Sequence, residues 1–167
     1  MNISTDLIKE LREQSGAGIM DCRTALVESS GDREKALQAL REKGLLKAKK
    51  TEHRVTGQGL VEAYVHPGGR IGAMVEIKCE TDFVARTEEF KSLAHCVALQ
   101  VAAMNPKYAS KDDVPQGTEA DIQAECLLEQ VFIRDPNKTV RDIVTEVIAK
   151  TGENVRVTRF ARFELGN

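Results

Sequence analysis

The feature that most limits the fold is a change in the spacing of apolar residues between positions 71 and 102. From residue 71 to 79 apolar residues occupy every second position, as expected for a strand with one buried face. From residue 90 to 102 they recur every three or four positions, as expected for a helix with one buried face. This helical stripe consists of Phe90, Leu93, Ala94, Val97, Ala98, Val101 and Ala102. A strand leading into a helix is therefore the expected centre of the core.

Thr81, Asp82 and Phe83 lie between these two elements. Either Thr81 or Asp82 can cap the helix, because its side-chain oxygen can accept a hydrogen bond from a free backbone N–H of the first turn. Phe83 has two interpretations. The commoner one is a core residue that folds back onto the strand, and the stretch taken alone favours it. The functional alternative is an aromatic side chain, next to an acid, that faces a partner.

Three strands are expected around this centre. Residues 60–65 form a strand that turns through residues 66–70 into the strand at 71–79, giving an antiparallel hairpin. A third strand over residues 155–165 must pair with the hairpin, because a two-stranded ribbon is marginal in water. One face of this strand is expected to carry Val155, Val157, Ala161, Phe163 and Leu165, and the other Arg156, Thr158 and Arg162.

A second helix precedes the last strand. It starts at Thr139, with Asp142 three positions later as the acid of a capping box, and it ends at Gly152. The predicted fold class is thus α+β, with helices covering one face of a three-stranded antiparallel sheet.

Residues 4–44 form a separate unit of three short helices. Ser4 or Thr5 caps the first and Asp32 caps the third. The helices are expected to end at Gly16, Gly31 and Gly44. We therefore predict a helical domain over residues 1–44, a basic linker over 45–58 and an α+β core over 59–167.

Ile19 and Met20 are two large apolar residues at the start of the second helix. One of the two must face outward. Either Met20 covers the edge of the helical unit, or Ile19 and Met20 form an adaptable apolar contact for another protein. The next residue, Asp21, is a candidate cap for this helix.

Composition excludes several functional classes. The net charge of −2 argues against a protein whose main partner is nucleic acid. The four cysteines and three histidines are scattered, so no metal site and no disulfide framework are expected. No cofactor is expected, since no phosphate-binding loop follows Gly68 and Gly69. No stretch has the length or composition of a signal or membrane segment, and we expect a cytoplasmic protein.

Two motifs and the closing strand can be compared with known families. They are Glu10-Leu11-Arg12 with Gly16-Ala17-Gly18-Ile19-Met20-Asp21-Cys22 and Ala25-Leu26, then Cys79-Glu80-Thr81-Asp82-Phe83-Val84-Ala85-Arg86, and finally Arg159-Phe160-Ala161-Arg162-Phe163-Glu164-Leu165-Gly166. Together they resemble the family of bacterial translation elongation factor Ts. The resemblance covers nearly the whole chain. It implies a ubiquitin-associated-like helical domain, an α+β core, and guanine-nucleotide exchange on the GTPase elongation factor Tu.

The resemblance also implies roles for particular residues. Thr81, Asp82, Phe83 and Val84 are expected to disturb the Mg²⁺ and phosphate-binding site of the GTPase. Ile19 and Met20 are expected to dock on one of its surface helices. Exchange needs only different affinities for the two states of the partner, so the protein is expected not to be an enzyme and to have no catalytic residues.

The chain departs from the family in its middle. Many relatives carry a long charged helical hairpin where this chain has only residues 116–126, so any contact made by that projection is in question here. Short relatives with one core unit are implied to work as homodimers, and an exposed edge of the sheet offers a pairing site. The alternative function is a small RNA-associated module that uses the basic linker with Arg156, Arg159 and Arg162.

Overall fold

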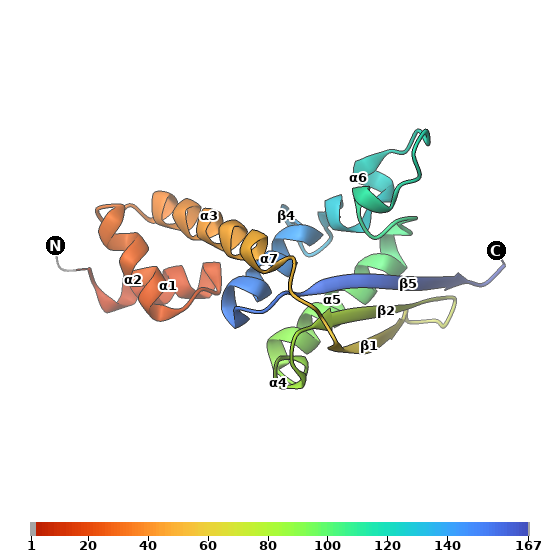
Figure 1. Cartoon of the computed structure of the whole chain (residues 1–167), viewed down its shortest axis with the longest axis horizontal. Helices are drawn as coiled ribbons and strands as arrows, with labels where there is room; N and C mark the ends of the chain where they lie inside the picture. The colour runs from red at the N-terminus through yellow and green to blue at the C-terminus, as the bar shows by residue number, and fades with distance from the viewer. Residues whose placement is uncertain (1–2, 167) are drawn as a thin grey trace. The chain divides into compact units, whose positions relative to one another are not determined.

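The computed structural model describes residues 3–166. The chain forms two compact units, and it passes between them three times. The first unit consists of the chain up to His53 together with Thr145–Asn154 (Figure 1). The second consists of Arg54–Val144 and the chain from Val155 onward. The last helix, α7 (Val140–Thr151), is divided between the two units.

The first unit is built on three helices, α1 (Thr5–Ser15), α2 (Ile19–Glu28) and α3 (Arg33–Thr51). Ser4 caps α1 and Asp32 caps α3, each by accepting a hydrogen bond from a backbone N–H of the first turn, as predicted. The three helices pack on one another, and α1 and α2, with 11 and 10 residues, are too short to be stable alone. Their shared core contains Ile8, Leu11, Cys22, Ala25, Leu26, Ala36 and Leu40.

The prediction that the third helix ends at Gly44 is wrong, because α3 continues to Thr51. Gly44 is buried within the helix, and a Cβ built on it would lie 3.5 Å from the Cβ of Ala149 in α7. This residue therefore marks a close approach of two helices and not a helix end. The Nζ of Lys47 donates to the carbonyl of Ala149 at 2.5 Å, which satisfies one of the free carbonyls at the end of α7.

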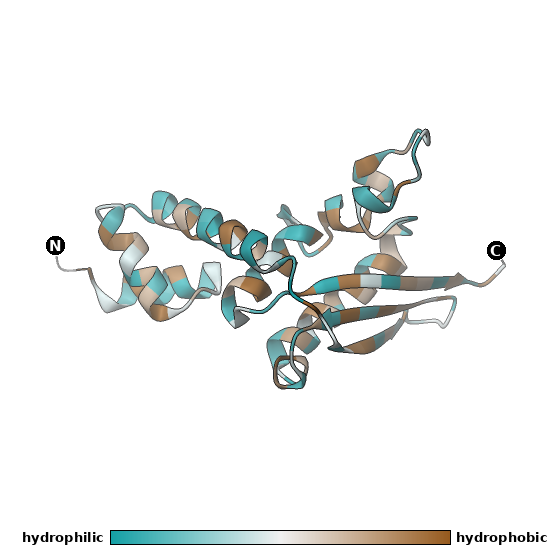
Figure 2. Ribbon diagram, viewed as in Figure 1, coloured by the Kyte–Doolittle hydropathy of each residue, from teal (hydrophilic) through white to brown (hydrophobic). Residues whose placement is uncertain are grey.

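The second unit is built on an antiparallel sheet of β1 (Gln58–Val65), β2 (Ile71–Cys79) and β5 (Arg156–Glu164), in the order β1-β2-β5. Apolar and polar residues alternate along the strands (Figure 2). The helix α5 (Glu88–Met104) packs against all three strands, and a short helix before it also contacts β1 and β2. Every member of the predicted helical stripe is buried. The fold class is α+β, as the alternation and the stripe indicated.

The faces assigned to the last strand are wrong beyond its first residues. Glu76 pairs with Arg159 and Ile77 with Val157, so Thr158 is an extra residue in β5. Such a bulge moves every following side chain to the opposite face. Val157 is buried as expected, but Phe163 is 75% exposed. Arg162 lies on the helix-covered side, where its Nε donates to the carbonyl of Ala102 at 2.9 Å.

The chain between α5 and α7 has little regular structure. It contains the single turns η1 (Lys111–Asp113), α6 (Ile122–Glu125) and η2 (Leu127–Glu129) and the ribbon of β3 (Val131–Phe132) and β4 (Asp135–Thr139). Within residues 116–126 the one helical element is α6, so no helical hairpin is present there.

Buried amides hold this segment to α5. The side chain of Gln100 donates to Gln130 Oε1 at 3.1 Å and to the carbonyl of Val131 at 3.0 Å, and it accepts from the backbone N–H of Ile133. Gln130 in turn donates to the carbonyl of Ala124. The hydrogen bonds compensate the cost of burying the two amides. The segment is thus fixed on the core by polar contacts as well as by apolar packing.

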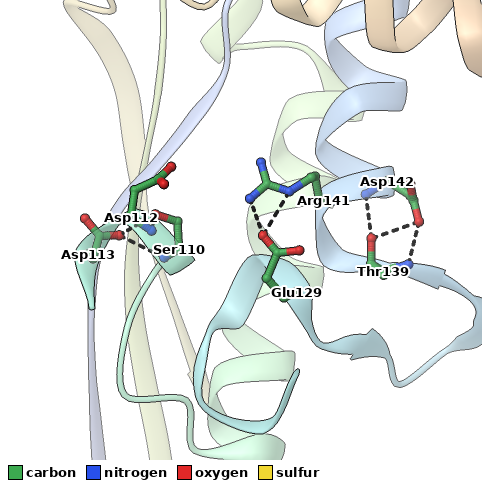
Figure 3. A network of polar contacts seen from close by, with 7 residues as sticks. All are labelled: Ser110, Asp112, Asp113, Glu129, Thr139, Arg141 and Asp142. Carbon is green, nitrogen blue, oxygen red and sulfur yellow. Dashed lines mark hydrogen bonds and ion pairs between the residues drawn. The ribbon is translucent and has the colours of Figure 1, made fainter. Parts of the chain in front are cut away.

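The start of α7 has the predicted capping box. Asp142 accepts from the backbone N–H of Thr139 at 2.7 Å, and the hydroxyl of Thr139 accepts from the N–H of Asp142 at 3.2 Å (Figure 3). The guanidinium of Arg141 pairs with Glu129 beside it. Two backbone donors of the first turn are therefore satisfied by local side chains.

Two glycines should respond to alanine in opposite ways. Gly59 has φ 151°, and a Cβ there would lie 2.1 Å from the carbonyl oxygen of Ile77, so Gly59→Ala should destabilise the protein by roughly 2 kcal/mol or more. Gly44→Ala should stabilise α3 by about 1 kcal/mol, because its Cβ would make only ordinary contact. Thermal unfolding followed by circular dichroism measures both. Equal melting temperatures for the two variants would contradict this account.

Candidate functional site

The candidate site is the corner formed by residues 79–87, where β2 gives way to α5. Two helices follow the strand, since the four-residue helix α4 (Asp82–Ala85) precedes α5. Thr81 caps α4 by accepting from the N–H of Val84 at 3.3 Å. Thr87 caps α5 by accepting from the N–H of Phe90 at 3.3 Å. Thr81 is therefore a helix cap as expected, but it caps the short helix α4. The helix with the buried stripe, α5, is capped by Thr87.

Phe83 projects outward from this corner. Its exposed fraction is 80%, whereas that of Val84 is 6%. The interpretation of Phe83 as a core residue is therefore wrong for this structure. A large apolar side chain with so much exposed surface gains little stability from burial, so folding alone does not explain its position. Val84, by contrast, faces the interior of its own unit.

The main chain next to Phe83 is held by three side chains. The hydroxyl of Thr87 donates to the carbonyl of Val84 at 2.8 Å, while Thr81 holds the N–H of the same residue. The buried thiol of Cys79 donates to the carbonyl of Thr81 at 3.1 Å. Backbone groups in a short turn are thereby satisfied without water, which gives the corner a defined shape.

The acidic residues of the corner are paired within the chain. Asp82 forms an ion pair with Arg86 at 2.9 Å, and both side chains are largely exposed. Glu80 lies 3.5 Å from Arg54. The exposed pair of Asp82 and Arg86 contributes little to stability, so a competing charge can displace it readily. Sequence reasoning did not single out Arg86 or Thr87, although the i, i+4 spacing of Asp82 and Arg86 was readable.

Ile19 and Met20 lie in the first unit, at the start of α2, with exposed fractions of 54% and 63%. Both face outward, although the pattern required only one to do so. Asp21 does not cap α2, whose cap position is occupied by Gly18; its carboxylate instead pairs with Lys43 of α3. Val27 is also half exposed and lies seven residues after Met20, which places the two on one side of the helix.

The structure brings Thr81, Asp82, Phe83 and Val84 together in one turn. Among residues 3–166, no group of three or more His, Cys, Asp or Glu side chains is arranged to hold a metal ion. Cys22, Cys79 and Cys126 are buried, and burial raises the pKa of the Cys126 thiol. The corner offers a shaped apolar projection flanked by charge, which suits contact with a macromolecule.

Within the part of the chain that the structure describes, no helix combines the length and the apolar character needed to cross a membrane.

Comparison with known proteins agrees with the motifs at this corner and in α2. The family model described as elongation factor TS matches residues 9–121. The chain is 50% identical to elongation factor Ts of Caldanaerobacter subterraneus subsp. tengcongensis, covering 98% of this chain and 97% of the relative. It is 47% identical to elongation factor Ts of Thermotoga maritima, covering 99% and 98%.

These alignments run over 194 residues, against 167 in this chain, so the relatives carry residues that have no counterpart here. The match to the family model ends at residue 121. Identity at this level over nearly the full length of both chains shows the family: the chain belongs to the elongation factor Ts family of translation elongation factors.

Proposed function

We propose that this protein is a guanine-nucleotide exchange factor that binds elongation factor Tu and promotes the release of GDP. The observation that carries the proposal is the exposed Phe83, on a corner held by hydrogen bonds, within a member of the elongation factor Ts family. A nucleotide-exchange factor for elongation factor Tu acts in translation, and we accordingly place this protein in the cytoplasm.

Such a factor acts by coupling two binding equilibria and performs no covalent chemistry. It binds the nucleotide-free GTPase more tightly than the GDP-bound form, and GDP weakens its binding by the same factor. Each ~1.4 kcal/mol of coupling changes the affinity for GDP about tenfold. The protein therefore needs a rigid group that fits the nucleotide-free partner and conflicts with the nucleotide-bound one.

Phe83 is the group that we assign to this conflict. Placed beside the Mg²⁺ and phosphate loop of the partner, its ring would occupy space that the bound nucleotide requires. Asp82 and Glu80 would bring negative charge toward the phosphates. Phosphate-binding loops favour anions, so these carboxylates would disturb the site that holds the nucleotide. Because Arg86 and Arg54 pair with these carboxylates, their contribution should be smaller than that of Phe83. Thr81 and Val84 would act by fixing the turn.

Docking is assigned to the first unit. Ile19 and Met20 form an exposed apolar pair on α2, and Val27 extends it along the same side of the helix. Contiguous exposed apolar side chains are typical of protein contacts, and methionine adapts its shape to a partner. We therefore expect this side of α2 to bind a surface helix of the GTPase, while the corner acts on the nucleotide site.

The RNA-associated alternative has less support. Arg159 pairs with Glu76 at 3.0 Å, and Arg162 pairs with Glu164 at 2.8 Å. These guanidinium groups would have to leave carboxylates before they could bind phosphate, and a face with paired charges lacks the positive field of nucleic-acid-binding proteins. Direct binding to nucleic acid is not part of the proposal.

We also propose a homodimer that forms through the sheet face opposite α5. This uncovered face carries the exposed apolar residues Val61, Val65, Met74 and Phe163. The strand register places Val65, Gly72 and Phe163 in one row across the sheet and Ala63, Met74 and Ala161 in the next. Two such faces can pack about 10 Å apart in a symmetric pair. The location of the apolar residues favours the face over the edge as the pairing site.

Phe83→Ala should slow GDP release from elongation factor Tu by at least about tenfold at saturating factor, because the coupling energy is lost with the ring. Its melting temperature should stay near that of the wild type, since an exposed side chain contributes within about 0.5 kcal/mol. Affinity for the nucleotide-free GTPase should fall less than the release rate. Stopped-flow release of labelled GDP and a thermal melt on the same sample measure the two effects.

Asp82→Ala should also slow GDP release, but by less than Phe83→Ala. Val131→Ala serves as the control, because Val131 is also exposed and lies in the second unit. A large loss of stability in Phe83→Ala with normal exchange by the folded fraction would end the proposed role of Phe83.

Met20→Ala should weaken binding to the nucleotide-free GTPase without unfolding the helical unit, because the side chain is 63% exposed and lies outside the core. Truncation of a buried interface anchor typically costs about 2 kcal/mol, a roughly thirty-fold loss of affinity. Titration calorimetry measures this affinity. Leu26→Ala, on the buried side of the same helix, should instead lower the melting temperature. Unchanged affinity in Met20→Ala would refute the docking role.

Sedimentation at micromolar concentration should show a species twice the 18.4 kDa of one chain. Met74→Glu should convert it to monomer, because Met74 is on the central strand and can reach a second copy only through the face. Val131→Glu is the matched control outside this sheet. A dimer that survives Met74→Glu would favour pairing at an edge, and a wild type that sediments only as monomer would exclude both arrangements.

A further inference from the structure

Thr87 joins the two helices of the corner through its side chain. Its hydroxyl donates to the carbonyl of Val84, in α4, and accepts from the N–H of Phe90, in α5, at 2.8 and 3.3 Å. The backbone N–H of Thr87 donates to the same carbonyl of Val84 at 3.0 Å. One hydroxyl thus serves as both donor and acceptor, which only Ser, Thr or Tyr could supply here.

Val84 is held at both ends of its backbone by threonine hydroxyls. Its N–H donates to Thr81 and its carbonyl accepts from Thr87. Its side chain is buried, and Phe90 at the start of α5 is completely buried. The carbonyl of Phe83, directly before Val84, accepts from the backbone N–H of Arg86 at 3.3 Å, and its ring is exposed. The direction of the ring therefore depends on the backbone of this turn, which the two threonines hold at Val84.

We propose that Thr87 is a positioning residue for nucleotide exchange, which fixes the direction of Phe83 through the backbone of Val84. The inference rests on the function proposed above. A helix of four residues does not hold its own shape in water, so without the Thr87 hydroxyl the turn would sample several conformations. The turn would then have to become ordered on binding, and the free energy of this ordering would reduce the coupling energy. A displacement of about 1 Å is enough to weaken an action that depends on fit.

The test compares GDP release from elongation factor Tu at saturating factor for three variants. Thr87→Val keeps the shape and removes both hydrogen bonds, and it should slow release about five-fold, the loss expected for about one net hydrogen bond. Thr87→Ser keeps the hydroxyl and should release GDP at close to the wild-type rate. Thr139→Val removes the equivalent threonine cap of α7 in the same chain and should leave release unchanged.

A double variant separates positioning from general stability. If Thr87 acts through Phe83, adding Thr87→Val to Phe83→Ala should slow release no further than Phe83→Ala alone. Losses that multiply in the double variant would overturn the inference, as would equal release by Thr87→Val and Thr87→Ser. If Thr87→Val fails to fold, Thr87→Ala removes the same hydrogen bonds without placing a methyl group against the Val84 carbonyl, and the same comparisons apply.

The failure of this inference is distinguishable from that of the proposed function. Slow release by Phe83→Ala together with normal release by Thr87→Val overturns the role of Thr87 alone. Normal release by Phe83→Ala overturns the mechanism at the corner, and the role of Thr87 with it.

Discussion

The second unit depends on the packing of α5 against the buried side of the sheet. Phe90, Val97 and Val101 are completely buried on the helix, and Val75 and Ile77 are buried on β2. Each such side chain contributes roughly 1.5–3 kcal/mol by leaving water. Because the strand and the helix are adjacent in sequence, their packing leaves only a short stretch to connect them. The corner is the conformation that this stretch must adopt.

The corner shows how a buried framework can present an exposed group. Val84 and Phe90 are fixed in the core, and the threonines at 81 and 87 satisfy the backbone between them. The ring of Phe83 is therefore directed outward. Its exposure costs the chain the stability that burial of an aromatic ring would give, which is the pattern expected where a residue is kept for contact with a partner. The acids beside it are paired with Arg86 and Arg54, which keeps the local charge balanced.

One extra residue in β5 also determines which side chains of the sheet are exposed. The bulge at Thr158 reverses the two faces of β5, so that Arg162 turns toward α5 and Phe163 joins Met74 on the uncovered face. Thr158 is itself fixed by its hydroxyl, which donates to Glu76 Oε1 at 2.6 Å. With Arg159 this hydrogen bond lowers the pKa of Glu76. A polar cluster thus sits next to the apolar rows and limits their extent.

Local patterns in the sequence determined the features that depend on neighbouring residues alone. These include the strand at 71–79, the buried stripe from Phe90 onward, and the caps at Ser4, Asp32 and Thr139. The family also followed from short motifs, because residues that carry a shared function stay in recognisable order.

Only the tertiary structure decided how those elements meet. The prediction of a helix end at Gly44 is wrong because the glycine marks a close approach of α3 to Ala149, about a hundred positions away in the sequence. The direction of Phe83 depends on which neighbour, Val84, enters the core, and the exposure of Phe163 depends on a register shift against β2. Each is set by contacts between distant segments, whose free energy outweighs the preference of any short stretch read alone.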